Sequence, residues 1–184
     1  MKQARRGLRP RLLFEDEAGF GRITDVRRCW APAPWRPIAP RQQVREFVHA
    51  LAAVSPFDGA ISAMLSRTLD TPVMSTFLAS IRDEFPGDFC IVVLDGAGYH
   101  VAEDLVVPAG LHLEWLPARS PELNPVELLL DFIRDHYIGN RAFPSLRRVE
   151  NTLCIAFQDL AHSPDIVQSM TLFEWIDRAS LTAR

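Results

Sequence analysis

Apolar and polar positions fall along the chain in patterns that predict strands alternating with helices. Apolar runs typical of buried strands cover residues 12–14, 47–54, 60–66, 89–94 and 111–116. Apolar positions at helical spacing predict helices over residues 71–85, 124–138 and 145–160, and a short helix after Ser163-Pro164. Asp58-Gly59 indicates a hairpin between the second and third strands. This order predicts an α/β fold with a mixed central sheet flanked by helices.

The segment between the first two strands is predicted to be irregular. Residues 18–21 contain two glycines and are expected to form a loop. Residues 30–40 carry four prolines and two tryptophans, which favours an extended, well-packed excursion over a helix. Trp30 and Trp35 are expected to pack in the interior or, alternatively, to stack on an unpaired base. Near the other end, residues 173–176 are predicted to pack back against the body.

Length and composition fit a single globular domain. The chain has 184 residues, of which 48% are hydrophobic and 23% charged. We assign residues 11–184 to the domain and residues 1–10 to a basic tail or linker remnant, either solvated or in contact with phosphate. No apolar run approaches the ~20 residues that span a bilayer, and no signal peptide opens the chain. Cys90 and Cys154 lie in apolar runs and are expected to be buried, which fits a reducing cytoplasm.

The formal net charge of −3 argues mildly against nucleic-acid binding, because DNA-binding domains are usually basic. That argument weakens if some of the acidic side chains hold metal. Two divalent cations would add four charges and bring the total to about +1, at the place where a phosphate would bind. Charge alone therefore leaves the class of partner open.

Three carboxylates stand at positions that suit a divalent-metal site. Asp16 closes the apolar run 12–14, Asp95 closes the run 89–94, and Glu127 lies in the first turn of a helix that Asn124 caps. Neighbouring strand ends lie about 5 Å apart, so carboxylates from distant segments can converge there. Hard oxygen ligands suit Mg²⁺ or Mn²⁺, and two such ions can cut or join a phosphodiester. The alternatives are turn-forming aspartates and a glutamate that only completes a capping box.

Other polar residues lie close to these three in the sequence. Strand alternation sends Glu15 and Glu17 to the face opposite Asp16, where they are expected to meet solvent or to support the ligands without binding metal. Glu17 and Asn124 are the candidates for such support.

Two cationic or ionisable residues are candidates for contact with DNA. His100 follows Asp95 by five residues and is expected to contact a phosphate, to hold a carboxylate, or to be a satisfied structural histidine. Arg119 is expected to meet a DNA phosphate, or else to be an ordinary surface charge.

Four segments resemble transposases of bacterial insertion sequences in the Tc/mariner superfamily: LLFEDEAGFG (12–21), IVVLDGAGYH (91–100), LPARSPELNPVE (116–127) and LFEWI (172–176). The resemblance implies an RNase H-like fold and a triad of acidic residues that binds two Mg²⁺ ions, for which Mn²⁺ can substitute. Carried over position by position, the triad is Asp16, Asp95 and Glu127. The implied activity is hydrolytic cleavage of DNA at transposon ends, followed by attack of the freed 3′-OH on target DNA.

The resemblance also implies binding partners, and the sequence departs from the family pattern at a few positions. It implies binding to transposon ends and target DNA, a homodimer or higher assembly, and a location in the bacterial cytoplasm. Members carry helix-turn-helix domains ahead of the catalytic domain, so we expect a separate or frameshift-fused reading frame to supply them, or else a truncated copy. Ala118, Arg119 and Leu130 depart from the usual proline, tyrosine and tryptophan. The alternative functions are a non-catalytic remnant and a cellular nuclease of the same fold.

Overall fold

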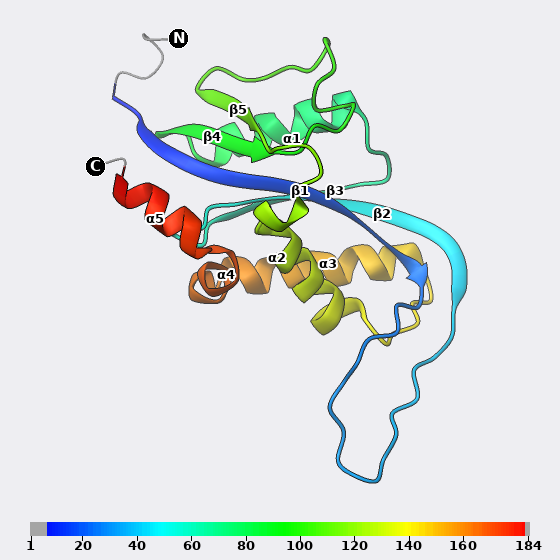
Figure 1. The fold of residues 1–184 in the computed structure, drawn as a ribbon. Helices are drawn as coiled ribbons and strands as arrows, with labels where there is room; N and C mark the ends of the chain where they lie inside the picture. The colour runs from blue at the N-terminus through cyan, green and yellow to red at the C-terminus, as the bar shows by residue number, and fades with distance from the viewer. Residues whose placement is uncertain (1–6, 183–184) are drawn as a thin grey trace.

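The centre of the molecule is a mixed sheet of five strands in the order β3-β2-β1-β4-β5 (Figure 1). The computed structural model describes residues 7–182. Its strands are β1 (Arg9–Ile23), β2 (Gln43–Val54), β3 (Ile61–Ser66), β4 (Asp88–Leu94) and β5 (Leu111–Trp115). β1 lies in the middle, antiparallel to β2 and parallel to β4. The mixed sheet flanked by helices that the sequence pattern predicts is confirmed.

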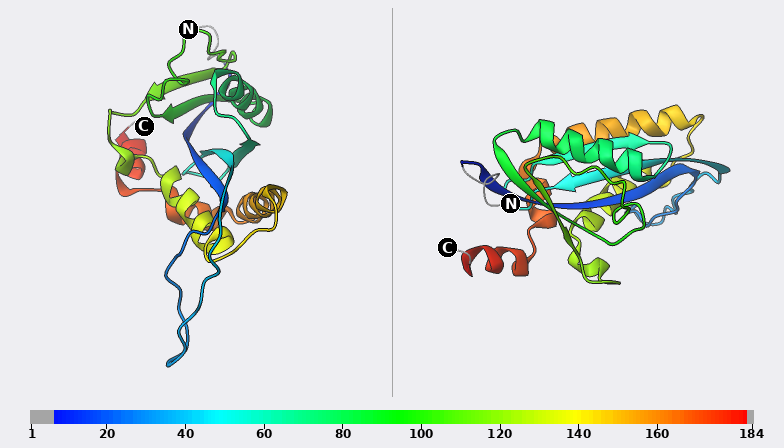
Figure 2. Two further views of the ribbon diagram at one scale, coloured as in Figure 1. Left: turned by 90° about the vertical axis from the view of Figure 1, so that its right-hand side faces the viewer. Right: turned by 90° about the horizontal axis from the view of Figure 1, so that it is seen from above.

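Helices cover both faces of this sheet (Figures 1 and 2). They are α1 (Thr71–Glu84), α2 (Val126–Ile133), α3 (Leu146–Ala161), α4 (Pro164–Thr171) and α5 (Glu174–Thr182), with a short helical turn η1 (Pro121–Leu123) and a π-helical turn η2 (Arg134–Ile138). α1 packs on the face that Leu13 enters, whereas α2 and α3 pack on the face that Phe14 enters. Successive side chains of β1 therefore enter two separate cores. Among the described residues, no helix has both the length and the apolar character needed to cross a bilayer.

β1 is much longer than the short strand predicted at residues 12–14. It continues through residues 18–21, where a loop was expected, because β2 pairs with it along this whole stretch and Phe20 is buried opposite Val48. The ladder shifts register at Gly21, where a Cβ would come within 2.4 Å of the Phe47 side chain, so only glycine fits there. The predicted tail also contributes to β1, which begins at Arg9, and residues 1–6 of that tail lie outside the described residues.

Helix starts follow the predicted chemistry with small shifts. The cap of α1 is Asp70, not Thr71, since its Oδ1 accepts a hydrogen bond from the Val73 N–H at 3.0 Å. Asn124 stands just ahead of α2, and its Oδ1 accepts from the Val126 N–H at 3.2 Å. The predicted end of this helix near residue 138 is confirmed, although its last turn, η2, is π-helical.

Several side chains expected in the interior are exposed. The Pro-rich excursion extends away from the body (Figure 1), with Trp30 103% and Trp35 76% exposed, so the expectation of buried tryptophans is wrong. Cys154 is also exposed, because it lies off the buried stripe of α3, which includes Leu153. The expectation for residues 173–176 is confirmed: Ile176 is buried in the core cluster that also contains Phe14.

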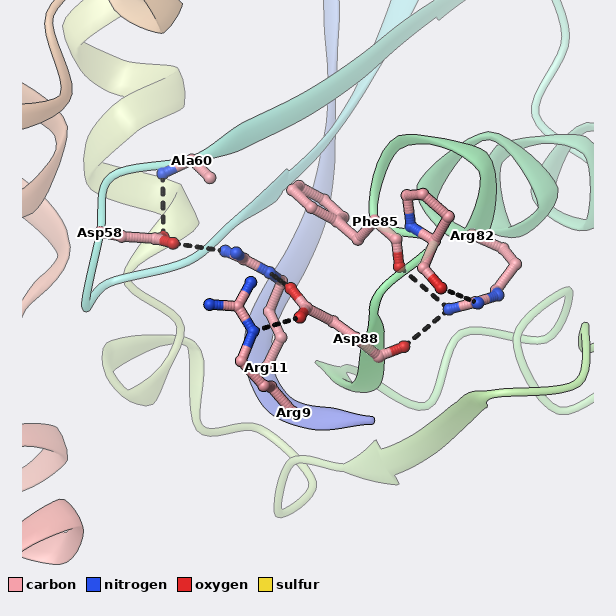
Figure 3. Close-up of polar contacts among 8 residues, drawn as sticks. Arg9, Arg11, Asp58, Ala60, Arg82, Phe85 and Asp88 are labelled. Atoms are coloured by element: carbon pink, nitrogen blue, oxygen red, sulfur yellow. Dashed lines mark hydrogen bonds and ion pairs between the residues drawn. The ribbon is translucent and has the colours of Figure 1, made fainter. Parts of the chain in front are cut away.

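An ion-pair cluster joins the starts of β1 and β4 (Figure 3). The Arg11 guanidinium donates to Asp88 Oδ2 at 2.6 Å and to Asp58 Oδ2 at 2.6 Å, and Arg9 donates to Asp88 Oδ1 at 3.2 Å. The hydrogen bond from Arg11 holds the pKa of the Asp88 carboxyl below its ordinary value. These contacts support the parallel pairing of β1 with β4, on which the geometry at the far end of both strands depends.

Candidate active site

Asp16, Asp95 and Glu127 line one cavity of about 320 Å³, although they come from three separate elements. The parallel ladder of β1 and β4 ends at the pair Phe14 and Val93, and Asp16 and Asp95 each lie two positions further along the chain. The two aspartates therefore leave adjacent strands at the same level of the sheet. Glu127 belongs to the first turn of α2, which reaches the same cavity. The structure thus brings the three predicted residues together.

Asn124 fastens the start of α2 to the centre of the sheet. Its side-chain Nδ2 donates to the Glu15 carbonyl oxygen at 2.8 Å, while its Oδ1 accepts from the Val126 N–H. The Asn124 side chain is buried, so neither contact competes with solvent. This pair of hydrogen bonds fixes the start of α2, the helix that carries Glu127, against β1. The supporting role of Asn124 toward metal ligands stays a prediction.

The charges in the cavity repel one another in the absence of a cation. The pKa of Asp16 is raised to about 6, first because the carboxyl is partly buried and further because Glu127 and Asp95 lie near it. A hydrogen bond from the Glu17 N–H to Asp16 Oδ1 at 2.9 Å opposes this rise. A set of oxygen donors whose negative charges oppose each other is the arrangement that Mg²⁺ or Mn²⁺ neutralises. The donor chemistry therefore fits the divalent ions that the sequence predicts.

His100 holds Asp95 and is inaccessible to DNA. Its Nδ1 lies 2.9 Å from Asp95 Oδ1 and 3.0 Å from the Asp95 carbonyl oxygen. The same Oδ1 accepts from the Ala97 N–H at 2.9 Å. His100 is only 1% exposed, so the expected phosphate contact is wrong and the alternative of holding a carboxylate is favoured.

Glu15 and Glu17 lie on the sheet face opposite Asp16, as alternation predicts, but they do not meet solvent. Glu15 is 0% exposed and the Glu17 side chain 12%, and both approach His100 Nε2, at 3.6 and 3.7 Å. Burial raises the pKa of Glu17 to about 8 and raises that of Glu15, and neighbouring carboxylates add to both shifts. Sequence reasoning missed this buried group. The available signal was three consecutive acidic residues in a strand, which must place carboxylates on both faces.

Two arginines lie near the cavity carboxylates: Arg119 lines the cavity itself, and Arg134 lines an adjoining pocket that Asp16 and Glu127 also reach. Arg119 lies in the loop that forms one wall, is exposed, and has a positive φ of 60°. Arg134 lies where the helix of Glu127 continues into η2, with its guanidinium 5.1 Å from the centre of the Phe20 ring and 3.1 Å from Asp131 Oδ1. The positive charge of Arg134 lowers the pKa of Asp16, against the larger effect of burial. Cationic side chains thus lie near these carboxylates.

Comparison with known proteins agrees with this geometry. The family model described as DDE superfamily endonuclease matches residues 11–150, which include all three carboxylates. An uncharacterized protein of Sinorhizobium fredii, y4pE/y4sA, is 36% identical over 134 residues, covering 72% of this chain and 99% of that protein.

The fold is similar to that of solved mariner complexes. The Mos1 mariner paired end complex with Mn matches 87% of this chain with a TM-score of 0.61 and 14% identity. The Mos1 transposase paired-end complex with left transposon end matches 91% with a TM-score of 0.59 and 13% identity. The chain spans 53% and 57% of the length of those two chains. These matches show the RNase H-like fold, and with the family match over most of its length this chain belongs to the DDE superfamily endonuclease family.

Proposed function

We propose that this chain is the catalytic domain of a transposase, which cleaves DNA at transposon ends and transfers the freed 3′-OH to target DNA. The observation that carries the proposal is the convergence of Asp16, Asp95 and Glu127 in one cavity. Membership of an endonuclease family supports nuclease chemistry, and the solved complexes that share the fold contain transposon ends or Mn. DNA is the proposed substrate, and a homodimer or higher assembly stays a prediction.

In this proposal Asp16, Asp95 and Glu127 would hold two Mg²⁺ or Mn²⁺ ions, the first through the two aspartates and the second with the help of Glu127. The ions would activate the attacking water or 3′-hydroxyl and neutralise charge on the leaving oxygen. The contribution of the protein is to hold the three carboxylates in position. β1 and β4 bring Asp16 and Asp95 to one level, and His100 and the Ala97 N–H orient the Asp95 carboxylate. Asn124 sets Glu127 beside them.

Arg119 is the proposed contact to the DNA backbone. Its side chain is exposed in the wall of the cavity, and a guanidinium suits a phosphate oxygen geometrically. The exposed Trp30 and Trp35 keep open the expectation that aromatic side chains stack on unpaired bases.

The first test is Mn²⁺ binding and Mn²⁺-dependent nicking of plasmid DNA by Glu127→Gln. We choose Glu127 because Asp95 also bonds to His100, so its substitution would disturb two groups at once. We expect Glu127→Gln to lose one Mn²⁺ by calorimetry and to slow nicking by about a hundredfold or more. Circular dichroism should show an unchanged fold, because Glu127 is exposed.

Glu122→Gln is the matched control, since Glu122 is also exposed and precedes Glu127 by five residues without lining the cavity. It should bind Mn²⁺ and nick DNA as the wild type does. Equal Mn²⁺ binding and nicking by all three proteins would refute the assignment. Absence of both activities in all three would favour the non-catalytic remnant.

A further inference from the structure

A second group of ligand atoms lies behind the cavity, on the face of β1 that α1 covers. It consists of Glu15, Glu17 and His100, and one ligand atom from each lies within 4.8 Å of the others. Glu15 and His100 are fully buried and Glu17 is nearly so. The group is distinct from the carboxylates of the cavity, because Asp16 points to the opposite face and Glu127 belongs to α2.

The polar atoms of this group are buried without partners. Both carboxylate oxygens of Glu15, Oε2 of Glu17 and Nε2 of His100 have no hydrogen-bond partner in the structure as described. The charged groups that act on Glu15 are all carboxylates: those of Glu17, Asp16 and Asp95. Buried acceptors without donors are costly, and several facing each other are more so. A cation at this point would bind one oxygen of each carboxylate and the Nε2 of His100.

The hydrogen bonds of His100 aim a lone pair at the carboxylates. Both atoms that face Nδ1 belong to Asp95, and both are acceptors, so Nδ1 carries the proton. In the neutral imidazole, Nε2 is then an acceptor that faces Glu15 Oε2 at 3.6 Å and Glu17 Oε2 at 3.7 Å. A carboxylate that accepts from one histidine nitrogen while the other nitrogen binds a metal is a recurrent arrangement in metal sites.

The separations also suit a metal ion. Bonds of about 2.1 Å in a tetrahedral site place ligand atoms roughly 3.4 Å apart. The observed 3.6 and 3.7 Å lie close to that value. An imidazole nitrogen with two carboxylates favours zinc and related transition metals, whereas Mg²⁺ prefers oxygen ligands alone.

We propose that Glu15, Glu17 and His100 bind a divalent transition-metal ion of the zinc type, separate from the ions of the cavity. Such an ion would fix the His100 ring and, through the bond from Nδ1, the Asp95 carboxylate. His100 is then a positioning residue that links the two sites. The proposal does not depend on the proposed function, because none of the three ligands belongs to the cavity set.

The test is Zn²⁺ calorimetry in the Glu127→Gln background, which weakens the cavity site and leaves the second site intact. Because Asp16 and Asp95 remain in this background, one Zn²⁺ can still enter the cavity. We expect a further Zn²⁺ to bind at the second site, and its affinity to fall at least roughly tenfold when Glu15→Gln is added. Glutamine keeps the shape of Glu15 and can donate a hydrogen bond to Glu17 or His100, so the fold should persist. If Glu15→Gln fails to fold, the more accessible Glu17→Gln replaces it.

The matched control is His112→Gln, which removes a half-buried histidine that also lies 3.5 Å from a carboxylate oxygen of Glu114. It should leave the affinity for Zn²⁺ unchanged. Failure of Glu127→Gln to alter Mn²⁺ binding would count against the cavity assignment alone. Loss of Zn²⁺ binding on Glu15→Gln would still support the second site.

Imidazole ¹⁵N NMR shows directly whether a metal ion or a proton is bound to the Nε2 of His100. On addition of Zn²⁺ to the Glu127→Gln protein, we expect the Nε2 resonance of His100, assigned with His100→Gln, to move to the position of a metal-bound nitrogen. Nδ1 should stay protonated. Two results together would overturn the proposal: a His100 Nε2 that carries a proton both before and after addition of Zn²⁺, and a Zn²⁺ affinity that Glu15→Gln does not change. They would show that protons satisfy the buried atoms of Glu15, Glu17 and His100.

Discussion

At the residue scale, Asp16 shows how burial and negative charge conflict in one side chain. It lies within β1, partly buried, with the negative charges of Asp95 and Glu127 close by. Its pKa is raised from 3.8 to about 6, so the folded protein holds this proton more tightly than the unfolded chain does. Ionisation of Asp16 therefore opposes folding: the cost is absent below pH 3.8 and complete above about pH 6.

The Asp16→Asn variant should remove that cost. In EDTA we expect it to be more stable than the wild type at pH 7, by about 1–3 kcal/mol, because one pKa unit corresponds to about 1.4 kcal/mol. At pH 3.5 the difference should shrink towards zero, since both proteins are then uncharged at this position. Urea unfolding at the two pH values measures the effect. A variant less stable than the wild type at pH 7 would contradict this account. A saturating concentration of Mg²⁺ should stabilise the wild type more than the variant, which lacks one of the three carboxylates.

At the scale of elements, the site depends on how α2 meets β1. α2 packs on the core that contains Phe14, and Asn124 adds a polar link, because its side chain satisfies the Val126 N–H and the Glu15 carbonyl oxygen together. The parallel pairing of β1 with β4 provides the second constraint, supported at its start by the ion pairs of Arg11 and Asp88 (Figure 3). The carboxylates converge because three elements are joined at these points.

Substitution of Asn124 by alanine should therefore harm both stability and metal binding. We expect a loss of about 1–3 kcal/mol of stability, because a buried carbonyl and a buried N–H lose their partner. Mn²⁺ affinity should fall as well, since Glu127 is no longer held beside Asp16. Urea unfolding and calorimetry measure the two effects. Asn151→Ala, at an exposed position on α3, is the control and should change neither; unaltered Mn²⁺ binding by Asn124→Ala would disprove the positioning role.

At the scale of the whole molecule, the distribution of charge governs the proposed binding of DNA. The formal net charge is −3, and carboxylates gather at the cavity that is the proposed DNA site. A cation in the cavity reverses this local repulsion, and exposed arginines such as Arg119 then provide attraction. Binding of metal and binding of DNA should therefore be coupled.

DNA binding should strengthen when EDTA is replaced by Ca²⁺, a divalent ion chosen to occupy the cavity without supporting cleavage. The physical reason is neutralisation of the cavity carboxylates. Fluorescence anisotropy with a labelled oligonucleotide measures this, and repetition over a range of salt concentrations gives the salt slope. Arg119→Ala should weaken binding and reduce that slope by about one. Arg147→Ala, an exposed arginine on α3, is the control, and equal slopes for both variants would exclude a specific phosphate contact by Arg119.

Local patterns in the sequence determined most elements of this protein. The apolar run before Asp95 forms β4. The two apolar runs on either side of Asp58-Gly59 form the antiparallel pair β2 and β3. The helical spacing behind Asn124 continues to residue 138. Each of these depends on residues close in the chain, where alternation, turn chemistry and capping act. The three candidate ligands could be named from the same patterns and from resemblance to a known family.

Only the tertiary structure decided the length of β1, the burial of Glu15 and the exposure of Trp30. β1 extends because β2 supplies partners for its hydrogen bonds, which its own residues do not encode. Alternation places Glu15 on a face of the sheet, but whether that face meets water depends on the segment that carries His100. The tryptophans are exposed because no other element within residues 7–182 covers the excursion (Figure 2). Burial depends on contacts between residues far apart in the chain, and no local pattern contains them.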